Sequence, residues 1–435
     1  MKSRWLRIAC TCLLLLVWNV NIIISVPVVC RDPDVGGTRQ TNDRKFLILG
    51  AEDTGGAGIG NLLIFYPAAF YFAAVTGRDI IITDKSVLGE MCNIVQCGFP
   101  FVSQLKLAFP KIVNDETIRR AEGLKFGDFI KYMEGANIAQ SPVVGVVGWM
   151  SKSDWWVWFN TTVHCVSKIT GCDLGDVMCA ERHAYQRLIR GPFKAGFSEQ
   201  EEKRIQGVPE YYKQSLLTLP HAFSPRIDIA IHLRLQFYYF ENQADPNSPE
   251  FKKEVQDWLD SDERKAVYEA MTYRVKERVK ELRPNGTKPE DDPIYIYLAA
   301  DNEEVKDHFQ DHLKVMDLGA PFHIMKVNSN AIHHVKNFAV FKKNSNNEGL
   351  LDLVFDWYAL SLANTIYAWR KGGTNMLSTF VHSAQKLSGT TERTDNSQGK
   401  GIGSRGYQLV RDKRGNLRFD LFWAYSFVED YAKRF

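Results

Sequence analysis

The sequence has no excess of charge of either sign. Its 435 residues include 54 Lys plus Arg and 51 Asp plus Glu, a formal net charge of +3, so neither a nucleic-acid partner nor an acidic tail is indicated. Long hydrophobic runs are also scarce, because only one stretch is uncharged for long enough to span a bilayer, and this argues against a multi-pass membrane protein. The hydrophobic share of 45% is that of an ordinary globular chain, which excludes global disorder.

The one long apolar run lies at the N-terminus. It covers Ile8–Cys30 and follows a positively charged N-terminal tail. Roughly 20 apolar residues span a bilayer core, and a positive flank stays on the cytoplasmic side. We therefore expect an N-terminal membrane segment, a single-pass signal anchor over residues 1–30, with the rest of the chain in the lumen. The alternative is a signal peptide that is cleaved near Pro27.

Cysteine use fits an exported chain. Cys10 and Cys12 lie inside the apolar run, and six cysteines remain from its last residue onward, namely Cys30, Cys92, Cys97, Cys165, Cys172 and Cys179. No C-x-x-C pair occurs, which disfavours a zinc site, so we expect disulfide bonds, whose pairing the sequence leaves open. Glycosylation sequons at Asn160 and Asn285 also suit a lumenal glycoprotein.

The chain after the anchor has the pattern of two α/β domains. Its first part contains a polar stem over residues 31–45, a strand at 46–50, a glycine-rich turn at 55–61, a helix at 62–75 and a strand at 79–83. This strand, turn, helix and strand form the start of an α/β layer. We place the first domain at residues 46–225.

A second α/β domain is expected over residues 226–390. Strands are predicted at 227–233, 292–299, 321–327 and 365–369, and helical segments at 249–282, 302–312 and 350–362. Such alternation is typical of a doubly wound, mostly parallel sheet. The remaining residues, 391–435, are expected to form a loop and a C-terminal hairpin that packs back on the core.

Polar residues gather where the predicted strands end, and open parallel sheets bind ligands at that edge. The glycine-rich turn includes Gly58, Gly60 and Asn61, and its glycines let the backbone approach an anionic ligand closely. A dinucleotide-binding turn is one interpretation, but no clear acidic ribose ligand follows the second strand. A tight turn before a packed helix is the other.

A histidine and an arginine end the strand at 227–233. His232 and Arg234 lie on the same face of this strand because side chains alternate. An arginine gives a planar fork of donors suited to phosphate, and the histidine adds a donor beside it. The pair therefore suits a pyrophosphate and the charge that develops on it when a bond breaks. A buried ion pair at a strand end is the alternative.

Two further segments carry polar groups at strand or helix ends. Asp301 follows the strand at 292–299, where a carboxylate can accept the N–H donors of guanine or a ribose hydroxyl, or else cap the next helix. Asp356 and Ser361 lie in the helix at 350–362. Small hydroxyls farther on, at Ser378 and Thr379, can hold phosphate oxygens.

In this order the segments resemble the GT-B-fold fucosyltransferases that use GDP-fucose, the superfamily of α1,2-, α1,6- and protein O-fucosyltransferases. GIGNLLIFYPAAFYFAAVTGRDIIITD resembles their opening segment, IHLR their HxR motif, and YLAADN their later strand ending in Asp. DWYALSLAN followed by STFVHSA resembles their D-x-x-x-L-S-x-A and Ser/Thr-Phe-Ser region. The resemblance covers about residues 46–390.

The resemblance implies a GT-B architecture, with two Rossmann-like domains facing each other across a cleft. The first would be the acceptor-side domain and the second the nucleotide-sugar domain. Arg234 and His232 would bind the β-phosphate of GDP and stabilise the leaving group. The further donor-site residues would be Gly58, Gly60, Asn61, Asp301, Asp356, Ser361, Ser378 and Thr379.

The sequence therefore predicts an inverting, metal-independent glycosyltransferase that moves fucose from GDP-fucose to a glycan or glycoprotein hydroxyl. It would need no cofactor, because Arg234 would neutralise the charge on the leaving group. Glu241 is the candidate general base, with Asp245 as the alternative, although both suit an ordinary loop. Trp155 and Trp156 would stack on acceptor sugars or else pack in a core. The expected location is the Golgi or endoplasmic reticulum membrane.

Three rival functions remain open. One is a GT-B enzyme that uses another nucleotide sugar. Another is a membrane-anchored lectin-like protein without catalysis, which would have no affinity for a nucleotide. A dinucleotide-dependent oxidoreductase is the weakest, because the chain has a secretory N-terminus and lacks the ribose-binding acid.

Overall fold

The structure is a computed structural model. It describes residues 29–33, 44–49, 59–84, 86–94, 96–123, 141–145, 164–174, 177–191, 205–206, 227–235, 248–283, 293–327, 348–371, 379–388, 405–411 and 417–422. The predicted membrane run, apart from Val29 and Cys30, lies outside these residues. Within them, no helix combines the length and the hydropathy that crossing a bilayer requires.

The chain divides into two compact units, which we describe separately. The sheet of the first unit is parallel and has the strand order β2-β1-β4. Its strands are β1 (Lys45–Leu49), β2 (Arg78–Ile82) and β4 (Val143–Gly145). This part of the chain includes the helices α2 (Ile59–Thr76), α3 (Val87–Ile94), α4 (Val102–Ala108), α5 (Asp115–Gly123) and α9 (Val177–Leu188). The division between the units falls within α2, α3 and α9.

Helix α2 confirms the predicted apolar helix and extends it. Residues 70–74 are fully buried on every side of the helix, which is the pattern of a core helix. It begins at Ile59, so Gly60 and Asn61 belong to its first turn, and the prediction of a turn as far as Asn61 is wrong there. The apolar pattern continues back to Ile59, and Gly60 is buried. The helix ends before Gly77, whose φ of +66° is the left-handed conformation of a helix C-terminal glycine.

The last residues of the predicted membrane run and the residues directly after them are packed against the end of α2. The N–H of Val29 donates to Val75 O at 2.8 Å, and that of Arg31 donates to Ala74 O at 3.0 Å. Val29 lies so close to Gly77 that a Cβ there would be 3.1 Å from both of its methyl groups. The fold of the first unit therefore includes the chain from Val29 onward.

A buried carboxylate on β2 joins both ends of the predicted stem. Asp79 is fully buried and pairs with Arg31 at 2.5 Å and with Arg44 at 2.7 Å. Arg44 also lies over the rings of Phe46 and Phe109. A buried carboxylate is stable only when it is paired and hydrogen-bonded, and here two guanidinium groups serve it.

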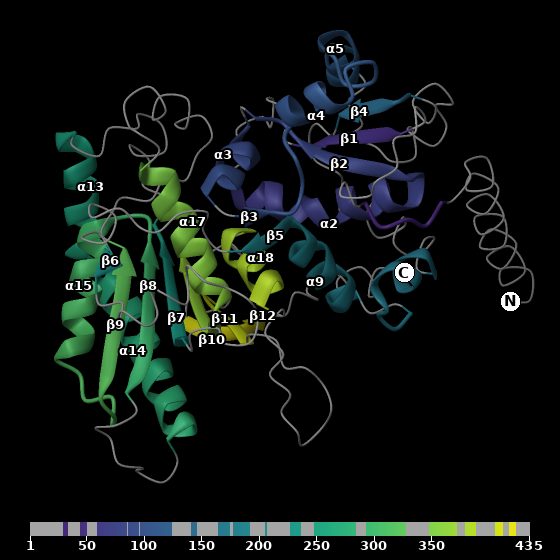
Figure 1. The fold of residues 1–435 in the computed structure, drawn as a ribbon. Helices are drawn as coiled ribbons and strands as arrows, with labels where there is room; N and C mark the ends of the chain where they lie inside the picture. Colours follow the sequence, from purple (N-terminus) through teal and green to yellow (C-terminus); the bar gives the residue numbers. More distant parts are fainter. Residues whose placement is uncertain are drawn as a thin grey trace, which may run out of the picture. The chain divides into compact units, whose positions relative to one another are not determined.

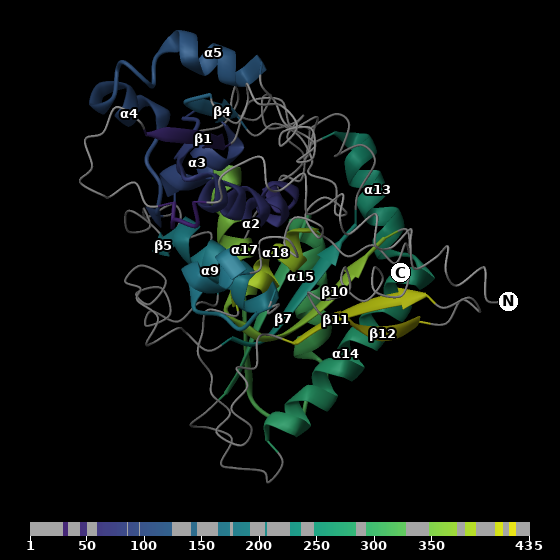
Figure 2. The same cartoon turned by 90° about the vertical axis from the view of Figure 1, so that its right-hand side faces the viewer.

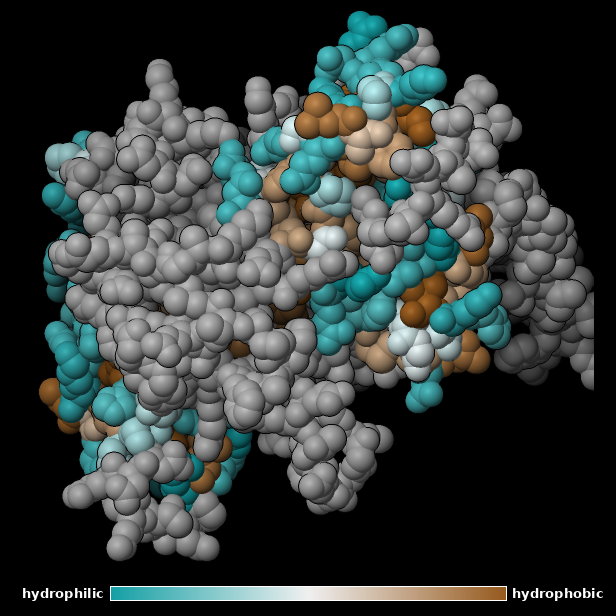
Figure 3. Space-filling model, in the orientation of Figure 1, coloured by the Kyte–Doolittle hydropathy of each residue, from teal (hydrophilic) through white to brown (hydrophobic). Residues whose placement is uncertain are grey.

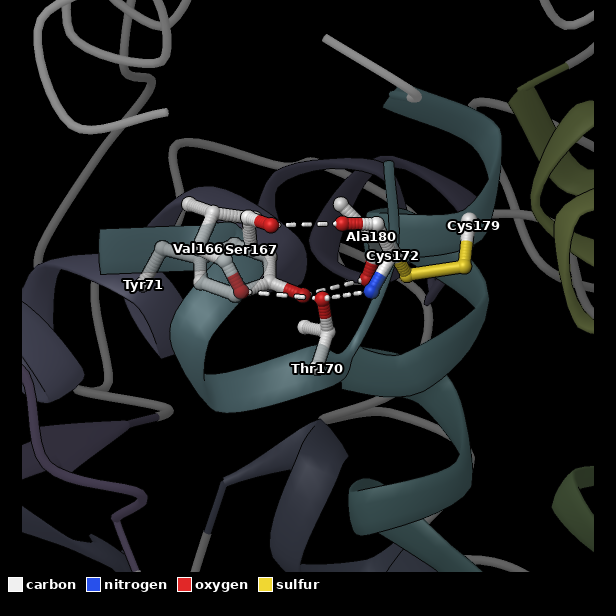
Figure 4. Close-up of a disulfide and its surroundings, with 7 residues drawn as sticks. All are labelled: Tyr71, Val166, Ser167, Thr170, Cys172, Cys179 and Ala180. Atoms are coloured by element: carbon white, nitrogen blue, oxygen red, sulfur yellow. Dashed lines mark hydrogen bonds between the residues drawn. A yellow bond between two sulfur atoms is a disulfide. The ribbon is translucent and has the colours of Figure 1, made fainter. Parts of the chain in front are cut away.

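The six cysteines from Cys30 onward all form disulfides, as predicted. The pairs are Cys30–Cys165, Cys92–Cys97 and Cys172–Cys179. Around the last pair, Tyr71 Oη donates to Ala180 O at 2.6 Å, and Thr170 Oγ1 accepts from the N–H of Cys172 at 3.0 Å (Figure 4). Disulfides persist in oxidising compartments, so this network fits an exported chain.

The second unit is built on a seven-stranded sheet with the order β12-β11-β10-β7-β8-β9-β6. Its strands are β6 (Ile205–Gln206), β7 (Ile227–Arg234), β8 (Ile294–Ala300), β9 (Phe322–Val327), β10 (Ala363–Arg370), β11 (Arg405–Arg411) and β12 (Leu417–Phe422). The five inner strands are parallel, and the edge strands β6 and β12 are antiparallel to their neighbours. A two-stranded sheet of β3 (Gln96–Cys97) and β5 (Ile189–Gly191) is separate.

Helices cover both faces of the seven-stranded sheet, so the doubly wound prediction is confirmed (Figures 1 and 2). They are α13 (Pro249–Leu259), α14 (Asp262–Leu282), α15 (Glu303–Lys314), α17 (Glu348–Ser361) and α18 (Thr379–Ser388). Helices α13, α14 and α15 lie on one face, and α17 and α18 on the other. The main core fills the first of these faces, where Ile229, Ile231 and Leu233 of β7 are buried.

One element of this unit differs from the prediction, and another has a pairing that was not predicted. The helical segment predicted at 249–282 is two helices, because Ser261 accepts the N–H of Arg264 and caps a new start. The C-terminal hairpin forms as predicted from β11 and β12, and β11 also pairs parallel with β10. The hairpin therefore extends the main sheet.

Exposed apolar side chains are spread over both units. Those that are large and exposed among the described residues are Val29, Leu107, Leu174, Tyr273, Val315 and Met316. On the face shown in Figure 3, hydrophilic and hydrophobic residues are mixed over α4 and α5. Scattered exposure of this kind is normal for a folded chain.

Candidate functional site

The candidate site lies where the inner strands of the second unit end. Strand β7 is at the centre, with β10 on one side and β8 on the other. Its His232 lies in register with Ala368 of β10 and Ala299 of β8. These two alanines have small side chains, so they fill little volume on either side of the imidazole. The strand then ends at Arg234, which is half-buried.

His232 faces helix α18. Its ring lies 5.8 Å from that of Phe380, so the first turn of α18 is beside the end of β7. Arg234, two residues farther along the strand, lies on the same face. The N-terminus of a helix presents free N–H groups and a positive dipole end, which favour an anion. The imidazole of His232 and the first turn of α18 therefore lie side by side, on the face of the sheet to which Arg234 also belongs.

His232 is neutral at physiological pH. Its side chain is 2% exposed, and its Nδ1 has no hydrogen-bond partner among the described residues. Burial lowers the pKa of His232 to about 3, and the charges of Arg234 and Lys306 act in the same direction. A neutral imidazole can donate one hydrogen bond but adds no charge. Positive charge at the end of β7 therefore comes from Arg234.

Asp301 is buried and is attached to the end of β7. Both of its carboxylate oxygens accept the backbone N–H of Leu235, at 3.1 and 3.0 Å. The residue that caps the next helix is Asn302 and not Asp301. Asn302 Oδ1 accepts the N–H of Val305 at 3.0 Å at the start of α15. Asp301 thereby fixes the backbone directly after Arg234, and its predicted contact with guanine stays a prediction.

Asp356 belongs to a buried polar network beside β8. It accepts the hydroxyl of Tyr297 at 2.6 Å, and its other oxygen lies 3.6 Å from Lys306 Nζ. Lys306 Nζ also donates to Val327 O at 2.8 Å. Burial raises the pKa of Asp356, while Lys306 and the hydrogen bond from Tyr297 oppose that rise. Burial raises the pKa of Tyr297 as well, and Asp356 adds to it. The network joins α15, α17, β8 and β9.

Of the other predicted residues of α17 and α18, Ser361 has a local partner. Ser361 Oγ donates to Tyr358 O at 2.6 Å, one turn back in α17. Thr379 is the first residue of α18. The two helices are joined by a hydrogen bond of 2.9 Å from Trp357 Nε1 to Ser383 Oγ. This contact holds the first turn of α18 in place beside His232.

The roles of the remaining predicted residues at this site stay predictions. Gly60 and Asn61 lie in the first turn of α2, within the same compact unit as His232. The predicted residues outside the described ranges are Gly58, Trp155, Trp156, Asn160, Glu241, Asp245, Asn285 and Ser378. Their roles stay predictions.

Sequence reasoning missed two cations of the site. Arg370 ends β10 just as Arg234 ends β7, so the same criterion, a cation leaving a buried strand, would have found it. Lys306 is 1% exposed and lies in the first turns of α15. The sequence around Lys306 gives no comparable indication of a buried cation, because a lysine in a charged helix is normally solvated.

The described residues contain no group of three His, Cys, Asp or Glu side chains that could hold a metal ion. The chain does hold Asp-x-Asp triplets, at residues 32–34 and 260–262. In the second, Asp260 caps the end of α13, and Asp262 pairs with Lys265 at 3.0 Å at the start of α14. That the reaction needs no metal stays a prediction.

Comparison with known proteins shows similarity to solved structures alone. No protein-family model matches the chain, and no curated protein matches it. A mutant of Arabidopsis thaliana FUT1 in complex with GDP aligns with 88% of this chain and 73% of its own, at 13% identity and a TM-score of 0.44. NodZ alpha-1,6-fucosyltransferase soaked with GDP-fucose aligns with 87% of this chain and 99% of its own, at 13% identity and a TM-score of 0.40.

Fucosyltransferase NodZ from Bradyrhizobium aligns with 87% of this chain and 99% of its own, at 13% identity and a TM-score of 0.38. The similarity to such proteins predicted from the sequence is thus found over most of the chain. Because these TM-scores are below 0.5, we assign no residue a role from the likeness.

Proposed function

We propose that this chain is an inverting, metal-independent fucosyltransferase of the GT-B type, which transfers fucose from GDP-fucose to a hydroxyl of a glycan or glycoprotein. One observation carries the proposal. The central strand β7 ends in a buried neutral imidazole and a guanidinium, on the face where α18 begins. Donors of this kind at the carboxyl end of a parallel sheet are suited to a nucleoside diphosphate.

The chemistry requires stabilisation of a leaving group. The acceptor hydroxyl attacks the anomeric carbon of the sugar, the bond from that carbon to the diphosphate breaks, and negative charge grows on the β-phosphate. A guanidinium placed there stabilises that charge in the transition state. Arg234 has this role in the proposal, and His232 donates a hydrogen bond without becoming charged.

The other donor-site residues act around this pair. Asp301 positions Arg234 through Leu235 and is proposed to contact the guanine of GDP. Asp356 and Ser361 shape the site from α17, while Thr379, with Ser378, lies near the phosphates. Gly58, Gly60 and Asn61 contribute from the start of α2.

The acceptor side of the proposal rests on the sequence. Glu241 or Asp245 would take the proton of the acceptor hydroxyl, and Trp155 and Trp156 would stack on acceptor sugars. The protein is placed in the Golgi or endoplasmic reticulum membrane, with an N-terminal anchor and the catalytic part in the lumen. The disulfides support this placement, because they need an oxidising compartment.

Turnover of labelled donor tests the proposal. A soluble fragment should begin before Val29, since a later start would remove Cys30 and the contacts with the end of α2. We expect it to release fucose from GDP-fucose, by hydrolysis or by transfer, with and without EDTA. GDP-mannose and UDP-sugars serve as competing donors, and preference for one of them would contradict the assignment of the sugar. A chain that binds no GDP in calorimetry would be the lectin-like alternative.

A further inference from the structure

A second arginine lies beside Arg234 at the end of the neighbouring strand. The register of β7 and β10 places Arg370 directly opposite Arg234. The pairing holds to the last residue, because the N–H of Lys371 donates to Arg234 O at 2.8 Å. Neighbouring strands are about 4.8 Å apart, so the two arginines start from adjacent points of the same sheet edge.

Both arginines lie on the face of the sheet that carries the candidate site. The ring contact with Phe380 places His232 on the face covered by α17 and α18. Directly paired residues of parallel strands lie on one face, so Ala368 shares the face of His232. Alternation then returns Arg370 to that face, as it does Arg234. Both are half-buried, so their guanidinium groups are partly shielded from water.

An anion that contacts two neighbouring guanidinium groups is attracted by both, and the attraction grows as the anion's charge grows. A diphosphate that is losing its sugar is such an anion. A single guanidinium contacts part of it, whereas two neighbouring ones can reach both phosphates.

We propose that Arg370 is a second catalytic cation, which holds the diphosphate of the donor together with Arg234. This inference rests on the proposed function, because it assigns a further residue to the same leaving group. Strand β10 extends as far as Arg370 and so brings the second arginine to the level of the first. A nucleoside monophosphate would engage the pair less than a diphosphate would.

Calorimetric titration with GDP and with GMP tests the inference. We expect Arg370→Met to weaken GDP binding about 10- to 100-fold, as for the loss of a hydrogen bond to a charged group, and to weaken GMP binding much less. It should also lower kcat for GDP-fucose. Arg370→Lys should restore part of both. The matched control is Arg274→Met, since Arg274 is a half-buried arginine of the same unit that lies over Phe419 on the other face.

Three outcomes would overturn the inference. They are unchanged GDP affinity and kcat in Arg370→Met, equal losses of GDP and GMP affinity, and no recovery in Arg370→Lys. Thermal unfolding of each variant separates these results from a folding defect, and Arg370→Gln replaces the methionine variant if that one does not fold. If Arg234→Met impairs GDP binding and Arg370→Met does not, only this inference fails. If the unaltered protein binds no GDP, the proposed function fails.

Discussion

Asp301 and Leu235 hold the ends of β8 and β7 together. Both oxygens of the buried carboxylate accept the same backbone N–H, at 3.1 and 3.0 Å. Leu235 directly follows Arg234, so this contact fixes the place from which the guanidinium extends. A charge-assisted hydrogen bond in a buried place is strong, and its geometry is well defined.

Replacing Asp301 tests this positioning role. Asp301→Ala leaves the N–H of Leu235 buried without an acceptor, so we expect a loss of about 1–3 kcal/mol in the free energy of unfolding and weaker GDP binding. Asp301→Asn keeps one acceptor and should lose less of both. Denaturant unfolding and calorimetry measure the two effects.

Inosine diphosphate distinguishes positioning from base recognition, because inosine lacks the 2-amino group of guanosine. If Asp301 acts through Leu235 alone, its variants weaken binding of GDP and of inosine diphosphate equally. A variant that loses the preference for GDP shows instead that the carboxylate contacts the base.

Arg234→Ala should lose most of its turnover with GDP-fucose while the protein remains folded. The reason is that the developing charge on the β-phosphate loses its guanidinium, and such groups are worth about 10²–10³ in rate when they act in the transition state. Initial rates with labelled donor measure the effect, and Arg274→Ala is the control. Near-normal transfer by Arg234→Ala would refute the proposed mechanism.

Acidification should destabilise the second unit through His232. Its pKa is about 3 in the folded protein and near 6.5 when exposed, so the unfolded chain binds more protons between these values. The stability that the neutral imidazole provides is therefore complete above pH 6.5 and falls as the pH drops toward 3. His232→Gln should reduce the slope of Tm against pH in that range. An unchanged slope would show that His232 is not buried as described.

Lys306 should matter to stability far more than a surface lysine does. Lys306→Met leaves the carboxylate of Asp356 buried without its cation, and breaking a buried pair in this way typically costs about 3–5 kcal/mol. Asp356→Asn in the same chain removes the unpaired charge and should recover part of that loss. The control is Lys280→Met. Lys280 forms an exposed pair with Glu277, and losing such a pair changes the free energy of unfolding by about 0–1 kcal/mol. Equal midpoints in urea for the two single variants would contradict the expectation.

The elements of the second unit could be predicted because their signals are local. The apolar run before Arg234 forms a strand, and the polar residue after β8 begins a helix. Even the hairpin of β11 and β12 could be predicted from its turn. The pairing of β11 with β10 could not be predicted, because it depends on which strand of the sheet has a free edge.

The site was predictable in its residue types but only partly in its contacts. His232 and Arg234 were predicted from two positions of one strand. The contact of Asp301 with Leu235 joins residues that are far apart in the sequence, and the pairing of Arg370 with Arg234 depends on the register of two strands. No single stretch of sequence encodes either relationship. The sequence predicts the start of α2 three residues too late, because glycines favour a turn, whereas the helix begins at Ile59 and includes Gly60.

Gly77 has a consequence for how the chain enters its first unit. A methyl group at this position would lie 3.1 Å from both methyl groups of Val29 and would require Val29, the residue before the cysteine that pairs with Cys165, to shift. The left-handed backbone there adds its own cost to any side chain. A substitution at this glycine would therefore be detected far from its own position, as a reactive thiol at Cys165 once the segment that carries Cys30 has detached.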